Sequence, residues 1–179
     1  MFQFLLLDAG PIIKLFSLGI WDVFIEHCEV GMSRIIAEDE VLYTEDDRER
    51  IDLNPYKERD LIKIIDVEPS VVKTFYDKFD LLYQADIHDG EKETLAFLFN
   101  SSDNWLVCSA DHVVFKMLGR LNKTNQGISL EEILKTIGIG QVSNWKNITP
   151  KDKDWKYTKK FKEKWTQKGQ IDFIQDQGV

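Results

Sequence analysis

At 179 residues, the chain is long enough for one domain with a hydrophobic core and short for two. Its composition is 43% hydrophobic and 30% charged with only 4 Pro and 10 Gly, which excludes disordered, low-complexity and fibrous proteins. The net charge of -8 is uneven, because residues 151–168 contain eight lysines against three acidic residues. A basic segment of this kind is able to touch nucleic acid, although a solvated helix face is the commoner explanation.

The first strand is expected at residues 2–7, where the apolar run FQFLLL shows little alternation. Such a run is typical of a strand that is covered on both faces in the middle of a parallel sheet. The run is too short to span a membrane, no basic residues precede it, and Asp8 ends it, so we expect neither a membrane span nor a signal peptide. We therefore expect a cytoplasmic protein.

Asp8 stands where this strand stops, and Gly10 and Pro11 follow it. Glycine permits an unusual turn and proline suits the first position of a helix. The pattern predicts that Asp8 lies at the carboxyl edge of the sheet, where open α/β sheets bind their ligands.

The remaining patterns alternate between helices and strands. Helices are expected at 11–18 and 21–26, a strand at 28–33, a helix at 34–43, a charged excursion at 44–60 and a strand at 61–67. Further along, helices are expected at 69–84 and from Asp89, a strand at 105–111, and helices at 112–121 and 128–138, the last with a capping box of Ser129 and Glu132. This order predicts an α/β fold with a mainly parallel sheet.

The basic C-terminal segment follows a weak boundary near residues 138–150. Tyr157, Phe161 and Trp165 recur every four residues, which predicts an amphipathic helix. The aromatic side chains are expected to dock this helix onto its own domain; a role in binding RNA or a partner protein is the alternative. Cys28 and Cys108 lie in apolar surroundings without metal-ligand spacing, so we expect buried thiols.

Acidic residues that could carry chemistry lie at four places in the sequence. Asp8 and Asp111 end two strands, an acidic cluster covers 38–40, and an acidic helix start covers 89–93. Each has an ordinary explanation as a turn, cap or helix-dipole residue. Four acids that converge on one crevice repel one another unless a cation neutralises them, and oxygen ligands without His or Cys suit Mg²⁺ or Mn²⁺.

The motifs LLLDAGPIIKL, EVLY, DGEKETLAFLF and LVCSADHVVFKML, in that order, resemble the PIN-domain ribonucleases. The resemblance covers about residues 1–140, with 141–179 left as a linker and a basic helical extension. It implies a three-layer α/β/α sandwich with a mainly parallel central sheet. It also implies a cluster of three or four acids that holds one or two divalent ions and hydrolyses RNA.

The resemblance places four catalytic and metal-binding acids: Asp8, Glu40, Glu91 and Asp111. Two assignments stay open. Asp39 is the alternative to Glu40, and Glu93 is able to share or replace the metal-binding role of Glu91. Ser109 takes the position two residues before the last acid.

The implied function is metal-dependent hydrolysis of RNA phosphodiester bonds, with RNA as substrate, a possible antitoxin-like protein partner and a possible homodimer. The serious alternative is a PIN-like module that binds RNA or protein without cleaving it. A haloacid dehalogenase-type phosphotransferase requires a second Asp at the position of Gly10, and a receiver domain requires an acidic pair where Ala9 stands. Both of these fit less well.

Overall fold

The computed structural model describes residues 2–45, 48–79, 81–139, 145 and 148–176. The chain forms two compact units, residues 1–105 and 106–179. Within the described part of the chain, no helix is both long enough and apolar enough to span a membrane.

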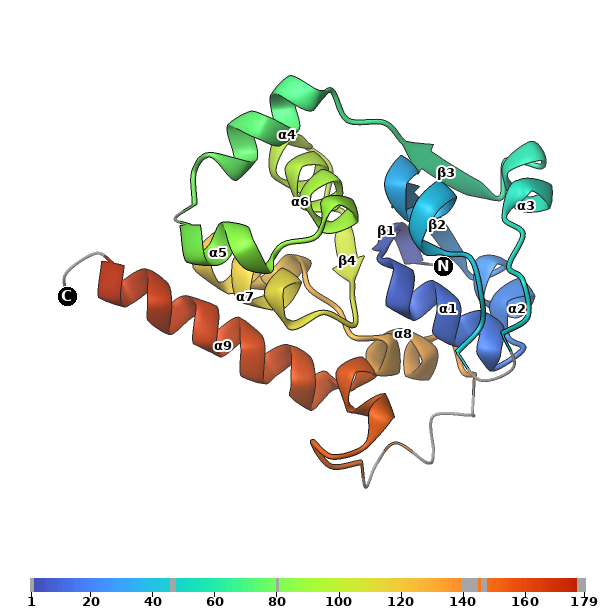
Figure 1. Cartoon of the computed structure of the whole chain (residues 1–179). Helices are drawn as coiled ribbons and strands as arrows, with labels where there is room; N and C mark the ends of the chain where they lie inside the picture. The colour runs from blue at the N-terminus through green and yellow to red at the C-terminus, as the bar shows by residue number, and fades with distance from the viewer. Residues whose placement is uncertain (1, 46–47, 80, 140–144, 146–147, 177–179) are drawn as a thin grey trace. The chain divides into compact units, whose positions relative to one another are not determined.

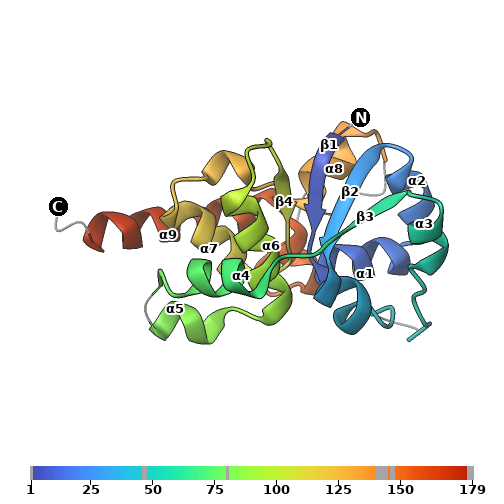
Figure 2. The same cartoon turned by 90° about the horizontal axis from the view of Figure 1, so that it is seen from above.

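The first unit contains the strands β1 (Phe2–Leu7), β2 (Cys28–Ser33) and β3 (Ile62–Ile65). They are parallel and lie in the order β3-β2-β1, as Figure 2 shows. In the register, Val30 of β2 stands opposite both Leu5 of β1 and Ile62 of β3. The expected α/β class with a parallel sheet is therefore confirmed.

Helices connect these strands and follow them. They are α1 (Ala9–Ser17), α2 (Trp21–Ile25), the π-helical turn η1 (Ile36–Glu40), α3 (Asn54–Glu58), α4 (Pro69–Tyr76), α5 (Leu81–Asp86) and α6 (Asp89–Asn100). Both α2 and α6 contact β2. The end of β1 is completely covered, with Leu5, Leu6 and Leu7 buried, as the apolar run predicts for a central strand.

Two expected helices are shorter in the structure. The helix expected at 34–43 ends at Glu40, because the chain then forms an antiparallel bridge between Tyr43 and Arg50. The helix expected at 69–84 is two helices, α4 and α5. The side-chain amide of Gln84 donates hydrogen bonds to the backbone carbonyls of Tyr76 and Phe79, which stabilises the break between them.

The second unit contains β4 (Leu106–Cys108), α7 (His112–Arg120), the 3-10 turn η2 (Thr124–Gln126), α8 (Leu130–Thr136), the 3-10 turn η4 (Lys153–Tyr157) and α9 (Lys159–Asp176). Helix α9 runs along α7 (Figure 1). The capping box at the start of α8 is confirmed: Glu132 accepts the backbone N–H of Ser129 at 3.0 Å, and Ser129 accepts that of Glu132 at 3.2 Å.

The two cysteines are buried thiols, as expected. Burial raises the pKa of Cys28 to about 12. At neutral pH this thiol is therefore protonated and a poor nucleophile.

Candidate functional site

Asp8 lies at the junction between β1 and α1. Its carboxylate is buried, with 7% of the residue exposed, and its Oδ1 accepts the backbone N–H of Ala9 at 2.8 Å. Asp8 has extended backbone angles and is the N-cap of α1, and Pro11 lies in the first turn of that helix. The strand and the helix start therefore fix the position of the carboxylate at the carboxyl end of β1.

Glu40 is the last residue of the π-helical turn η1. The N–H of Val41 donates to the carbonyl of Ile36 at 3.0 Å, five residues back, so this turn is one residue wider than an α-helical turn. The wider turn changes the direction in which Glu40 points. Its carboxylate accepts the backbone N–H of Gly90 at the start of α6.

Gly90 and Glu40 are in very close contact. A Cβ atom on Gly90 would lie 2.7 Å from Oε1 of Glu40 and 2.9 Å from Oε2. A side chain at position 90 would therefore displace the carboxylate. Glycine at position 90 thus leaves room for the carboxylate of Glu40, a residue fifty positions earlier in the chain, and for the side chain of Ile36.

The environment of Glu40 disfavours its negative charge. Burial raises the pKa of Glu40, and the nearby Asp8 carboxylate raises it further, whereas the Gly90 hydrogen bond and His88 lower it. The net effect is an increase. Two carboxylates in this arrangement are best stabilised by a cation bound between them.

Glu91 and Glu93 point to different neighbours. Glu91 is 5% exposed, and its Oε2 accepts the backbone N–H of His88 at 2.8 Å, which caps α6. Glu93 accepts hydrogen bonds from the backbone of Ile35 and from the hydroxyl of Ser33, the last residue of β2. Residues two apart on a helix lie about 200° apart around its axis, so these two acids do not face the same ligand.

Burial raises the pKa of Glu93, although its two hydrogen bonds counteract this increase. Its Oε2 is a buried oxygen for which the described residues provide no hydrogen-bond partner. Glu93 also lines a cavity of about 310 Å³, which is bordered by α4 residues such as Val72 and Tyr76. These contacts give Glu93 a place separate from the Glu40–Gly90 contact.

The alternative second acid, Asp39, is exposed, whereas Glu40 is half-buried against Gly90. Of these two acids, Glu40 is the one whose pKa the charge of Asp8 raises, so Glu40 lies within electrostatic reach of Asp8 in the first unit. Sequence reasoning did not identify Gly90 and His88 as neighbours of Glu40. The available signal was the DG pair at the start of the acidic helix, where a glycine in a first turn indicates a close approach.

Asp111 belongs to the second unit, where it is the N-cap of α7. Its Oδ1 accepts the backbone N–H of Val113 at 2.9 Å, and its own N–H donates to the hydroxyl of buried Ser109 at 2.8 Å. His112 Nδ1 lies 3.1 Å from the same carboxylate oxygen. The Ser-x-Asp spacing therefore fixes the loop that ends β4.

The described residues contain no group of three or more acidic, histidine or cysteine side chains arranged to hold one metal ion. The pair of Asp8 and Glu40 still fits magnesium. This ion keeps several of its waters and is commonly held by one or two carboxylates together with phosphates of the substrate. Oxygen donors alone are also the ligand type that suits Mg²⁺ and Mn²⁺.

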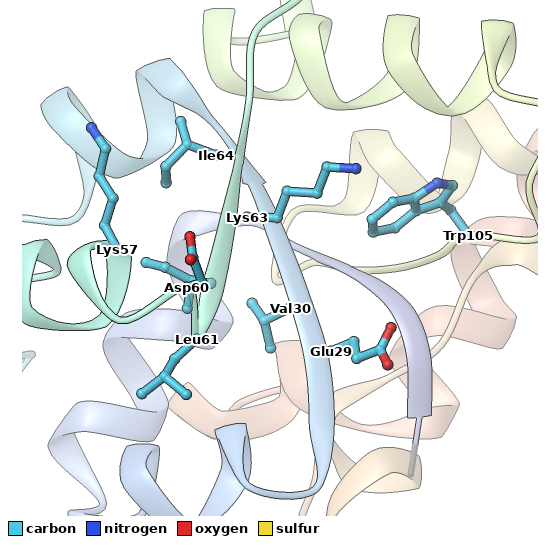
Figure 3. Close-up of a pocket in the computed structure, with 9 residues that line it drawn as sticks. Glu29, Val30, Lys57, Asp60, Leu61, Lys63, Ile64 and Trp105 are labelled. Carbon is cyan, nitrogen blue, oxygen red and sulfur yellow. The ribbon is translucent and has the colours of Figure 1, made fainter.

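A separate cavity of about 770 Å³ lies in the first unit, beside β2 and β3 (Figure 3). Its lining includes Glu29, Val30, Asp60, Lys63 and Trp105, and the ammonium group of Lys63 lies 5.7 Å from the ring centre of Trp105. None of the acids expected from the sequence lines this cavity. It therefore does not contribute to the candidate site.

Comparisons with protein-family models, with curated proteins and with solved structures find no match. The resemblance to PIN-domain ribonucleases rests on the sequence motifs alone.

Proposed function

We propose that this protein is a divalent-metal-dependent ribonuclease with a PIN-like, three-layer α/β/α fold. The observation that carries the proposal is the Glu40 carboxylate, which packs against Gly90 and whose pKa is raised by burial and by the charge of the buried Asp8. Burial and like charge both oppose ionisation of Glu40, and a bound cation offsets both effects. Hydrolysis of a phosphodiester is the chemistry that a carboxylate-held Mg²⁺ or Mn²⁺ ion serves best.

In this proposal Asp8 and Glu40 hold the ion in the first unit. The N–H of Gly90 keeps the Glu40 carboxylate in one orientation, and the cap at Ala9 does the same for Asp8. When bound, the ion supplies an acidified water and positive charge for the phosphate. Direct attack of water on phosphorus requires no covalent enzyme intermediate.

Glu91 of the first unit and Asp111 of the second unit are the other acids named in the proposal. The hydroxyl of Ser109 fixes the backbone at Asp111, and the capping bond to His88 fixes Glu91. We leave Glu93 out of the set, because residues two apart on a helix point in different directions and Glu93 lines the cavity beside α4. RNA is the proposed substrate, and the cytoplasm is the proposed location because RNA substrates are found there.

A PIN-like binding module without catalytic activity is the second candidate. The observation that favours it is that Asp8, Glu91 and Asp111 all have capping roles that need no metal. A toxin with an antitoxin-like partner and a homodimer are further proposals within the nuclease account. A neighbouring gene that encodes a small DNA-binding protein would favour the toxin.

The experiment that separates the two candidates is a cleavage assay on labelled single-stranded RNA with the purified full chain. The nuclease proposal expects cleavage with Mg²⁺ or Mn²⁺, none with EDTA, and a large loss of rate in Asp111→Asn. Asparagine is as good an N-cap as aspartate, so this variant removes the charge and keeps the cap of α7. Binding of RNA without cleavage under any metal condition would support the binding module instead.

A further inference from the structure

Helix α9 is fixed tightly to α7 within the second unit. A Cβ atom on Gly169 would overlap the carbonyl oxygen of Lys116, and one on Gly119 would overlap that of Thr166. The two helix backbones are therefore in direct contact through glycines. Phe161, which is buried, adds an edge-to-face contact with Phe115 at 6.1 Å between ring centres.

On the docked side of α9, the side that packs against α7 and α8, lysines form ion pairs that neutralise their charge. Lys162 lies 2.8 Å from Glu132 of α8, and Lys116 of α7 lies 3.2 Å from Asp172. The backbone N–H of Lys159 donates to Glu131 at 2.8 Å. The docked side thus accounts for part of the positive charge of the C-terminal segment.

A second side of α9 carries a row of lysines at a spacing of four residues: Lys160, Lys164 and Lys168. All three are exposed, and no acidic group among the described residues lies within ion-pair distance of them. Residues four apart lie above one another on a helix, about 6 Å apart along its axis. The row is therefore a strip of cations that is not neutralised by described neighbours.

An aromatic ring borders this row. The ammonium groups of Lys164 and Lys168 each lie 5.1 Å from the ring centre of Trp165, which is half-buried. Trp165 also contacts the ring of His112, with 4.5 Å between the ring centres, and lies edge-to-face to the ring of Phe161 at 6.3 Å. His112 also lies 3.1 Å, through Nδ1, from a carboxylate oxygen of Asp111, so His112 links Trp165 to the proposed catalytic acid within the second unit.

We propose that Trp165, Lys164, Lys168 and Lys160 form a binding surface for single-stranded RNA, in which Trp165 stacks on a base and the lysines contact phosphates. Single strands are bound by this combination of cations along the backbone and aromatic rings against the bases. An acidic protein partner would contact the lysines, but it would offer no base to stack on the ring of Trp165. The choice of RNA rests on the proposed function. In that function, this surface would be the place where the protein contacts its RNA substrate.

The test measures binding of a fluorescein-labelled ten-nucleotide oligouridylate to the full chain by anisotropy, in EDTA and at several salt concentrations. Lys164→Gln/Lys168→Gln should reduce affinity about tenfold or more at low salt and reduce the magnitude of the salt slope by about 1.4, since each contact with a single strand contributes about 0.7. Lys57→Gln/Lys73→Gln removes two exposed lysines from the first unit and is the matched control, expected to leave binding unchanged.

The stacking role has its own variants. Trp165→Leu should weaken binding by about tenfold, because stacking contributes about 1–3 kcal/mol per base, whereas Trp165→Phe should retain most of the affinity. Equal binding by the native chain and Lys164→Gln/Lys168→Gln would overturn the proposal, as would the absence of RNA binding by the native chain. Because these measurements are made in EDTA, cleavage with Mn²⁺ tests the nuclease separately: binding without cleavage would leave this surface in place and reject the nuclease.

Discussion

The carboxylate of Glu40 occupies the space that a side chain at Gly90 would need, 2.7 Å from the position of the missing Cβ. The N–H of Gly90 donates to the same carboxylate. Helix α6 therefore holds Glu40 in place through its backbone, and the orientation of Glu40 beside Asp8 depends on a residue that carries no side chain.

Gly90→Ala should disrupt this arrangement. The added methyl group meets Oε1 of Glu40 and Cγ1 of Ile36 at 2.7 Å each, so one or both must move. We expect a loss of about 1–3 kcal/mol in the free energy of unfolding, typical of overpacking, together with weaker stabilisation by Mn²⁺. Adding Glu40→Asp, which shortens the acid, should restore part of the stability. Chemical denaturation measures the stability of the single and the double variant. An unaltered stability in Gly90→Ala would show that Gly90 and Glu40 are not in close contact in solution.

Removal of the charge at position 40 should stabilise the metal-free protein. The folded-state pKa of Glu40 is raised, so its ionised form costs stability at neutral pH, and this cost disappears as the pH falls through that pKa. Glu40→Gln in EDTA should therefore melt higher at pH 7, by at most about 2–4 °C, which corresponds to about 1 kcal/mol for a chain of this size. Solvent screening of this half-buried group keeps the effect small.

The gain from Glu40→Gln should shrink as melting is repeated at lower pH, because native Glu40 then becomes protonated too. Asp39→Asn is the matched control, since Asp39 is the exposed neighbour on the same turn. A lower melting temperature for Glu40→Gln at pH 7 would mean that Glu40 is stabilised by contacts other than those with Gly90 and His88.

Asp8 allows its charge and its capping role to be separated. Asparagine caps helices as well as aspartate does, so Asp8→Asn should melt higher than the native chain in EDTA and gain little from Mn²⁺. Asp8→Ala also removes the cap at Ala9 and should lose about 1 kcal/mol. Native protein should gain about 2.7 kcal/mol at a hundredfold excess of Mn²⁺ over its dissociation constant. A full response to Mn²⁺ in Asp8→Asn would remove Asp8 from the site.

Much of the framework is predictable from local sequence. The strand expected at 28–33 matches β2, and Ser129 with Glu132 forms the expected capping box. The break between α4 and α5 is not predictable in this way. The apolar spacing continues across it, and the hydrogen bonds from Gln84 that stabilise the break depend on how the chain folds back.

In the candidate site, too, some features are predictable from local sequence and others are not. The sequence indicates that Asp8 follows a central strand, because the apolar run and Pro11 are adjacent to it. It does not reveal the π-helical turn that directs Glu40 toward Gly90, because that contact joins residues fifty positions apart. From the sequence, Glu93 is able to share or replace the role of Glu91, whereas in the structure the two acids have different hydrogen-bond partners.

The glycine contact between α7 and α9 should be essential for docking the C-terminal helix. Gly169→Ala should destabilise the chain by about 1–3 kcal/mol although alanine favours helices, because its methyl group would overlap the backbone at Lys116. Limited proteolysis should then cut earlier within α9. Gln167→Ala, on an exposed position of the same helix, should behave as the native chain. Equal protease resistance in both variants would show that the helices are not in backbone contact.

The rate of RNA cleavage as a function of Mn²⁺ concentration tests the central claim most directly. We expect native protein to cleave in a saturable, EDTA-sensitive manner. Glu40→Gln should lose at least about 100-fold, because even residues that only orient a metal ligand typically cost 10–100-fold, and Asp39→Asn should match the native chain. Equal Mn²⁺ dependence in native protein and Glu40→Gln, or cleavage that persists in EDTA, would contradict the account.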